Sequence, residues 1–326
     1  MTPDSFPGSL PGPALAVDVG GTKLAVGIVD GAGNRRAHAQ IPTRVEAPAG
    51  IDRDRPGGEA EPGEVLFARL SALVDEVRGA WIDGGGAPPV VCGVGTGGPM
   101  ERDGDVVSPL NIPVWDGFPL RSRLATHTGL ATFVDNDAKA LALAEGWVGA
   151  AAGCANFIGM VVSTGVGGGI VLDGRLLDGE RGNAGHIGHI VVEPDGRACR
   201  CGSQGCLEAE ASGTAIAAMT GRTPAEADAA TIERTGTLVG RAVACVAVLL
   251  DLRLAVVAGS VALGYGEPFF AAAQAEIDTR ARLAYAAGCV IRPAGLAAEA
   301  PLVGAAAVGY RGLGLSLPSD GALGAE

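Results

Sequence analysis

Two apolar segments, each interrupted by a glycine-rich turn, constrain the fold of this chain more than any other feature of its sequence. Residues 15–29 read LAVDVGGTKLAVGIV, and residues 157–172 follow the same plan around STGVGGG. Apolar runs joined by glycine turns are typical of β-hairpins. Neither turn has Walker A spacing, and neither opens a helix as a dinucleotide-binding fingerprint does. Two such units, far apart in the chain, predict two lobes.

The other segments alternate between strand-like and helix-like patterns, which predicts an α/β protein. We expect strands in VVCGVGTGGP, over 131–134 and 254–257 and near Val290, and helices over 63–81, 137–149, 235–250, 268–285 and 302–312. The small lobe is expected over 15–134, joined by the C-terminal helix 301–314, and the large lobe over 135–300. We expect disordered ends at 1–14 and 315–326 and a surface loop at 44–63.

Charge and hydropathy exclude several classes of protein. The 326 residues include 36 acidic and 24 basic side chains, which give a net charge of −12. Such a charge disfavours binding to nucleic acid or to anionic membranes. No apolar run approaches the roughly 18 residues that a membrane span needs, and the first residues lack a signal-peptide pattern. We therefore expect a cytoplasmic protein that acts on a small molecule.

Both glycine turns are candidate phosphate sites. Glycines let backbone N–H groups converge on an anion, and a nearby carboxylate can hold Mg²⁺. An ordinary hairpin is the alternative for either turn alone, but the pair favours a nucleotide held by two turns. The candidate ATP and Mg²⁺ residues are Asp18, Gly20, Gly21, Thr22 and Lys23 in the first turn and Thr164, Gly165 and Gly167 in the second.

One histidine and three cysteines form a candidate metal site. His189, Cys199, Cys201 and Cys206 lie within 18 residues, inside a knuckle that we place at 186–208. One imidazole and three thiolates are a donor set of structural zinc sites. Unligated thiols or a redox pair are the alternatives, and the crowding of the four residues favours zinc. We expect the remaining cysteines in the core: Cys92, Cys154, Cys245 and Cys289.

DVGGTK, STGVGGG and the cysteine knuckle, in this order, resemble the ROK family of sugar kinases and sugar-responsive repressors. The resemblance runs from about Leu15 to Gly312. It implies a two-lobed actin/hexokinase-like (ribonuclease-H-like) fold with nucleotide and sugar in the interlobe cleft. It also implies ATP with Mg²⁺, a structural Zn²⁺ and a homodimer. A repressor would carry a winged-helix domain before the first turn, where this chain has about 14 residues, so we expect a kinase.

The resemblance also implies the residues of the sugar site. Asn136 and Asp137 match the pair that contacts the sugar, with Asp137 as the catalytic base. The residues alone favour an acidic N-cap for the helix that follows. His189 is expected to bind zinc with one ring nitrogen and a sugar hydroxyl with the other. The other matching positions are Gly98, Asn111 and Glu208 for the sugar and Gly259 for the adenosine.

One departure from the family pattern bears on the substrate. Glucokinases of the family have a glutamate where this chain has His186, also a candidate sugar-binding residue. An imidazole can donate a hydrogen bond to a carbonyl, which a carboxylate cannot do. This slightly favours N-acetylmannosamine, with the 6-hydroxyl group as acceptor. Glucose, a cyclitol, polyphosphate in place of ATP and a catalytically silent sugar sensor stay open. Lys139, near the base, has no explanation in the sequence.

Overall fold

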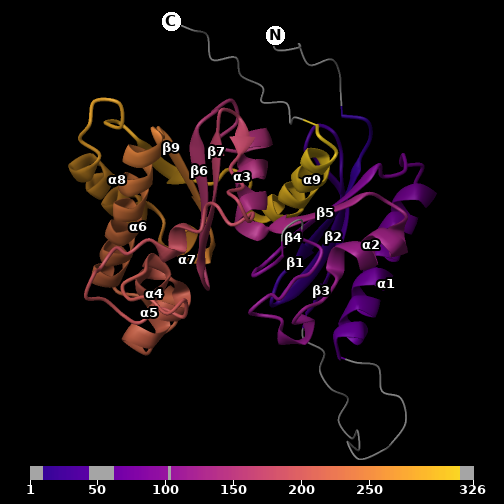
Figure 1. Ribbon diagram of the computed structural model, residues 1–326, viewed down its shortest axis with the longest axis horizontal. Coiled ribbons are helices and arrows are strands. Elements are labelled where there is room, and N and C mark those ends of the chain that lie inside the picture. Colours follow the sequence, from indigo (N-terminus) through magenta and orange to yellow (C-terminus); the bar gives the residue numbers. More distant parts are fainter. Residues whose placement is uncertain (1–9, 44–61, 102–103, 316–326) are drawn as a thin grey trace, which may run out of the picture. The chain divides into compact units, whose positions relative to one another are not determined.

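The computed structural model describes residues 10–43, 62–101 and 104–315 (Figure 1). They form two compact units. Unit 1 contains the described residues up to Asp137 and those from Pro301 onward, and unit 2 contains Ala138–Ala300. Disorder was expected at 1–14 and 315–326: residues 1–9 and 316–326 lie outside the described residues, while Ala14 begins a strand. Nearly all of the loop expected at 44–63 also lies outside the described residues.

The described part of unit 1 contains a five-stranded mixed sheet with the order β3-β2-β1-β4-β5. β1 pairs antiparallel with β2 and parallel with β4, which pairs parallel with β5. The strands are β1 (Ala14–Val19), β2 (Lys23–Val29), β3 (Arg35–Pro42), β4 (Val91–Thr96) and β5 (Thr132–Asn136). The helices of this unit are α1 (Pro62–Asp83), α2 (Leu120–Thr128) and α9 (Ala300–Gly312), with the 3-10 turn η2 (Pro113–Trp115).

Helices cover both faces of this sheet. Apolar residues of α1 and α2 share one core with alternate residues of β1 and β4, such as Val17 and Val94. α9 packs on the other face, where Gly93 points because side chains alternate along a strand. A Cβ atom at Gly93 would lie 1.9 Å from the Ala305 carbonyl oxygen, so only glycine lets α9 come this close. The C-terminal helix therefore completes the first unit.

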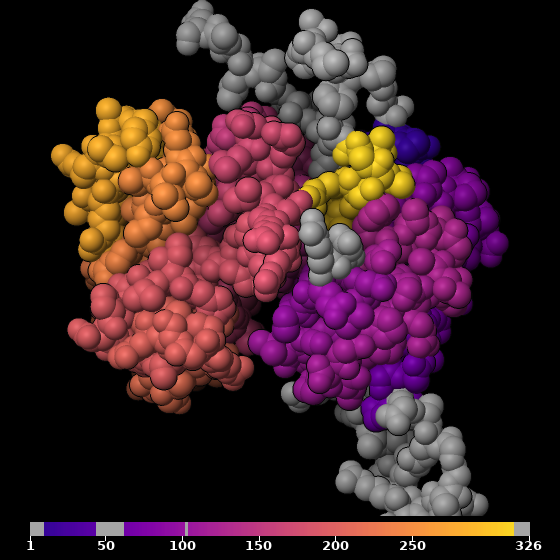
Figure 2. Space-filling view, in the orientation of Figure 1, coloured from indigo at the N-terminus to yellow at the C-terminus, as the bar shows by residue number. Residues whose placement is uncertain are grey.

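The described part of unit 2 contains a second five-stranded sheet, with the order β10-β9-β6-β7-β8. Its strands are β6 (Phe157–Val162), β7 (Val166–Leu172), β8 (Arg175–Leu176), β9 (Leu254–Ala258) and β10 (Val290–Pro293). Its helices are α3 (Asp137–Val148), α4 (Leu207–Ala211), α5 (Gly213–Thr220), α6 (Ala229–Leu250), α7 (Ser260–Tyr265) and α8 (Glu267–Arg280). The segment with α4 and α5 forms part of the surface of unit 2 (Figure 2).

The α/β class and both glycine hairpins are confirmed, with several corrections. The helix expected over 268–285 ends at Arg280, and the helix expected from 235 begins at Ala229. Strand β3, at the edge of its sheet, was missed although exposed and half-buried residues alternate along it. Cys92 and Cys289 are buried as expected, but Cys245 is exposed on α6 and Cys154 is half-buried. Among the described residues, no helix is long and apolar enough to cross a membrane.

Candidate functional site

The carboxyl ends of three parallel strands bring the candidate residues of unit 1 together. Val19, Thr96 and Asn136 lie side by side in the register of β1, β4 and β5. The chain leaves these strands at the first glycine turn, at Gly98 and at Asp137. Ligands of open α/β sheets usually bind at this edge, where the loops after the strands meet. The topology therefore gathers groups that are up to 119 residues apart, from Asp18 to Asp137.

Asp18 has an unusual charge environment. Burial raises the pKa of Asp18 to about 7, and the nearby Asp137 carboxylate adds to the rise while the Lys23 ammonium group opposes it. An electrostatic effect of this kind requires the two carboxylates to lie near one another. Like-charged groups held together in this way can share a proton or a cation. The Asp18 and Asp137 carboxylates therefore lie close enough to influence one another.

The first glycine turn contacts Asn111, one of the residues expected to bind sugar. The Gly20 N–H donates to the Lys23 carbonyl at 3.0 Å and closes the turn. A Cβ atom at Gly21 would lie within 2.8 Å of three side-chain atoms of Asn111, so glycine is required there. Thr22 and Lys23 are exposed at the tip. The first glycine turn and Asn111 are therefore adjacent.

A second contact of the same edge links Gly98 to Asn136. A Cβ atom at Gly98 would lie 3.9 Å from the Asn136 side-chain nitrogen, an ordinary van der Waals separation. A Cβ atom at the neighbouring Gly97 would lie 3.6 Å from the Asn111 side-chain oxygen. Gly98, Asn111 and Asn136 therefore belong to one cluster around the ends of β4 and β5.

The second glycine turn is bound to the segment that follows the cysteine knuckle. Glu208, on α4, accepts a hydrogen bond from the Val166 N–H at 2.9 Å. A Cβ atom at Gly165 would lie 2.7 Å from the same carboxylate oxygen. The Thr164 carbonyl accepts from the N–H and the hydroxyl of Thr214, at 3.2 Å and 2.9 Å. Glu208 is thus fixed by the turn expected to bind phosphate.

Gly167 and Gly259 also have packing roles. A Cβ atom at Gly167 would lie 2.9 Å from the Ala138 Cβ atom, so α3 packs directly on this strand. Gly259 has φ +102°, a conformation that favours glycine. The next residue, Ser260, shares a hydrogen bond of 2.9 Å with the Ser163 hydroxyl. The end of β9 therefore meets the second glycine turn, as a nucleotide site in this unit would require.

The four candidate metal ligands converge. Their ligand atoms all lie within 4.8 Å of one another. The Cys199 Sγ atom lies 3.6 Å from the His189 Nδ1 atom, and the Cys201 and Cys206 Sγ atoms lie 3.7 Å apart. A zinc tetrahedron has edges of about 3.6 Å between nitrogen and sulfur and about 3.8 Å between two sulfurs. The donor set and its spacing therefore fit zinc and do not fit a disulfide.

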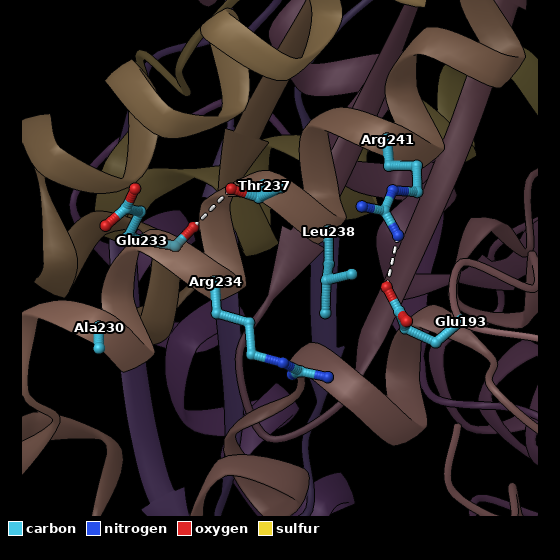
Figure 3. A pocket seen from close by; sticks show the side chains of 7 residues that line it. All are labelled: Glu193, Ala230, Glu233, Arg234, Thr237, Leu238 and Arg241. Atoms are coloured by element: carbon cyan, nitrogen blue, oxygen red, sulfur yellow. Dashed lines mark hydrogen bonds and ion pairs between the residues drawn. The ribbon is translucent and has the colours of Figure 1, made fainter. Parts of the chain in front are cut away.

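The knuckle is also held by two arginines of α6, which the sequence analysis missed. Arg241 pairs with Glu193, just before the knuckle cysteines, and donates to the Val192 carbonyl at 2.8 Å. Arg234 pairs with Glu210, just after them, at 2.6 Å. The two arginines are seven residues apart, so they lie on one face of the helix. An open hollow of about 340 Å³ lies along this face (Figure 3).

Glu210 is the centre of this attachment. Its carboxylate is 2% exposed and also pairs with Arg197 at 3.0 Å. Burial opposes its ionisation, but the Arg197 backbone N–H and the guanidinium groups of Arg234 and Arg197 outweigh it and lower the pKa of Glu210. Because Glu208 lies two residues earlier in the same short helix, these bonds also fix the carboxylate expected to bind sugar. In the sequence, the only indication of this attachment is the spacing of seven residues between Arg234 and Arg241, which places both on one face of a helix.

His186 and His189 lie at the two ends of one short turn. The His189 N–H donates to the His186 carbonyl at 3.1 Å, and the two rings have centroids 6.3 Å apart with an interplanar angle of 19°. The His189 Nδ1 atom faces the cysteines. Its Nε2 atom is therefore the ring nitrogen left for another ligand.

A model of the ROK family matches residues 14–310. A glucokinase from Thermotoga maritima is 39% identical over 204 residues, which are 62% of this chain and 58%, less than two thirds, of that enzyme. An N-acetylmannosamine kinase from Salmonella arizonae is 36% identical over 267 residues, 77% of this chain and 84% of that enzyme. A crystal structure of a ROK-family glucokinase from Streptomyces griseus, in complex with glucose and AMPPNP, has 27% identity and a TM-score of 0.72, with 92% of this chain and 100% of that chain covered.

Proposed function

Since this chain belongs to the ROK family, and so has its actin/hexokinase-like fold, we propose that it is a sugar kinase that transfers the γ-phosphoryl group of ATP to a hexose or N-acetylhexosamine. The 6-hydroxyl group is the proposed acceptor. The observation that carries the proposal is the nearness of Asp18 and Asp137 at the edge where β1 and β5 end. Curated relatives named as sugar kinases support it.

Asp137 is the proposed general base. The acceptor hydroxyl gives its proton to the Asp137 carboxylate as its oxygen attacks the γ-phosphorus. The bond from the γ-phosphorus to the β–γ bridging oxygen breaks, and ADP leaves with that electron pair. Phosphoryl transfer depends mainly on positioning and on charge stabilisation. The Asp137 carboxylate, directly after β5, would supply the positioning of the acceptor hydroxyl.

The two glycine turns are the proposed phosphate sites, with Gly259 near the adenosine. Backbone N–H groups of Gly21 and Gly165 would face phosphate oxygens, and Lys23 would add a positive charge, while the Gly20 N–H closes the first turn on the Lys23 carbonyl. Asp18 would hold the Mg²⁺ that accompanies ATP, which neutralises charge on the β- and γ-phosphates. The Ser163–Ser260 hydrogen bond supports this assignment, because it joins the second turn to the residue after Gly259.

His186, His189 and Glu208 are the proposed sugar ligands of unit 2, and Gly98, Asn111 and Asn136 are those of unit 1. A donor at His186 favours an acetamido carbonyl, which supports N-acetylmannosamine over glucose. Glucose remains the second candidate, because one relative is a glucokinase and one similar structure contains glucose.

A comparison of ADP release with the two sugars tests the proposal. We expect kcat/KM for N-acetylmannosamine to exceed that for glucose, since the acetamido group gains one hydrogen bond worth about a factor of ten. Glucose-favouring or equal values would reject the acetamido substrate. No ADP release with any hexose, N-acetylhexosamine or cyclitol would favour a sugar sensor. Sugar phosphate formed with polyphosphate but not with ATP, measured as the sugar phosphate itself because this donor releases no ADP, would identify polyphosphate as the donor.

His189, Cys199, Cys201 and Cys206 would hold a structural zinc ion. A bound zinc ion fixes the tautomer and the orientation of its histidine. The His189 Nε2–H would then donate to a sugar hydroxyl. We also propose that the protein acts in the cytoplasm, where thiols stay reduced. The homodimer stays a prediction that sedimentation would test.

Removal of the zinc is expected to lower kcat/KM for the sugar about 10- to 100-fold, the range for lost support of a ligand-bearing histidine. KM for ATP should change less, because none of the four proposed zinc ligands is among the proposed ATP residues. Metal content and kinetics of Cys199→Ser, with zinc added back to chelated wild type, check this. Cys245→Ser, at the exposed cysteine of α6, is the control. Full activity of a zinc-free protein would contradict the prediction.

A further inference from the structure

The chain has two lysines, Lys23 and Lys139, and the second is buried. Lys139 lies on α3, two residues after Asp137, and its side chain is 3% exposed. Its ammonium group donates to the Asp178 carboxylate at 3.0 Å and to the Gly182 carbonyl at 3.2 Å. A buried ammonium group is unfavourable unless it is paired and hydrogen-bonded. This lysine therefore needs partners, and the Asp178 and Gly182 groups that it contacts lie in one loop.

That loop, residues 177–186, leads from β8 to His186. It follows β7 in the reverse direction: the Leu177 N–H donates to the Ile170 carbonyl at 2.8 Å, and Gly185 lies against Gly168. A Cβ atom at Gly185 would lie 2.6 Å from the Gly168 carbonyl oxygen, so the loop touches the strand there. The loop is thus anchored at its start, near Asp178, and at its end, next to His186.

Lys139 contacts the start of the loop at Asp178 and its middle at Gly182, from a helix on the opposite face of β7. A Cβ atom at Gly169 would lie 2.8 Å from the Lys139 Cα atom, while neighbouring Gly168 faces the loop. The Asp178 carbonyl also accepts from the Ala184 N–H at 2.9 Å, which closes the loop on itself. The Lys139 ammonium group therefore attaches a loop that its own backbone hydrogen bond already closes.

We propose that Lys139 is a positioning residue that determines acceptor specificity, because it holds loop 177–186 and so fixes His186. The inference rests on the proposed function, in which His186 meets the acceptor. Lys139 itself touches no substrate. It acts through Asp178 and the backbone at Gly182, and one helix therefore carries both the base and the residue that orients the specificity loop.

Chemical labelling tests the attachment without any assay of activity. Acetic anhydride should modify exposed Lys23 in the wild-type protein and spare Lys139, as measured by peptide mass spectrometry. The Asp178→Asn variant removes the carboxylate charge that pairs with Lys139. In this variant, labelling of Lys139 relative to Lys23 should rise about tenfold. Glu180→Gln makes the same chemical change at an exposed residue of the same loop and should leave the ratio unchanged. Equal protection in Asp178→Asn would overturn the proposal.

Lys139→Met provides a second variant, which keeps an unbranched apolar side chain and leaves no buried charge. Trypsin should cut after exposed Arg181, inside the loop, about tenfold faster than in the wild type. KM for the sugar should rise about 10- to 100-fold, as expected when a binding group is misplaced. KM for ATP should change by less than about twofold, and selectivity between N-acetylmannosamine and glucose should fall. If Lys139 only stabilised the fold, Lys139→Met would lower the thermal stability without raising KM for the sugar selectively and without changing the sugar selectivity.

The outcomes separate the two proposals. If the wild type releases no ADP with any sugar, the proposed function fails, and labelling and proteolysis still decide whether Lys139 holds the loop. If the wild type is active but Lys139→Met keeps the sugar KM and the selectivity, the specificity role fails while the kinase proposal stands. Slow cleavage at Arg181 in Lys139→Met would reject the attachment itself.

Discussion

The Asp137→Asn variant is expected to lose about 10²–10⁴-fold in kcat, the usual contribution of a general base. An amide keeps the size of the side chain and its place at the start of α3, but it cannot accept the proton of the acceptor hydroxyl. KM for ATP and for the sugar should change little, since the lost interaction belongs to the transition state. Steady-state kinetics with a coupled ADP assay measures these values.

Two controls make the Asp137 result specific. Asp173→Asn changes an exposed aspartate of unit 2, outside the proposed site, and should keep wild-type kcat. Thermal unfolding of Asp137→Asn should lie near that of the wild type or above it, because the variant removes a charge that raises the pKa of Asp18. A variant with wild-type kcat would show that Asp137 is only a helix cap and that another group takes the proton.

The Asp18→Asn variant is expected to lose about 10²–10³-fold in activity and yet to be more stable than the wild type at pH 8 without Mg²⁺. Loss of a preorganised electrostatic group at a reacting centre typically costs this much in rate. Stability should change in the opposite direction, because the folded protein holds the Asp18 carboxylate where its charged form is disfavoured. The variant thus separates the requirement for catalysis from the requirement for folding.

The pH dependence of that stability difference has a definite sign. The pKa of Asp18 is raised from 3.8 to about 7, so the folded state binds a proton more tightly than the unfolded state. Between these two values the wild type loses stability as the pH rises, and the loss is complete above about 7. The full difference corresponds to up to about 4 kcal/mol. Both proteins should be about equally stable near pH 4.

Calorimetry of wild type and Asp18→Asn at several pH values, in buffer free of Mg²⁺, checks this expectation. The melting temperatures should diverge by several degrees between pH 5 and 8, with the variant higher. Mg²⁺ with ATP should reduce the difference, because a bound cation stabilises the Asp18 carboxylate only in the wild type. Parallel pH profiles for the two proteins would contradict the proposed environment of Asp18.

The sequence alone determined the local features of this protein. The first glycine turn, the second one and the knuckle each consist of residues close together in the chain, so residue type and spacing determine their geometry. The four knuckle ligands, for example, lie within 18 residues, and their donor atoms do meet within 4.8 Å. Helix ends followed less directly from the sequence: α8 ends at Arg280, although the apolar pattern predicts a helix as far as residue 285.

Only the tertiary structure decided which distant groups support these motifs. Lys139 and Asp178 are 39 residues apart, and Arg234 and Glu210 are 24 apart. Each pair forms because two elements pack against the same sheet or helix, and no spacing rule in the sequence specifies such a contact. The same holds for Asp18, whose raised pKa depends on burial and on Asp137, two strands away in the sheet. Charge environment follows from packing, and packing is a property of the whole fold.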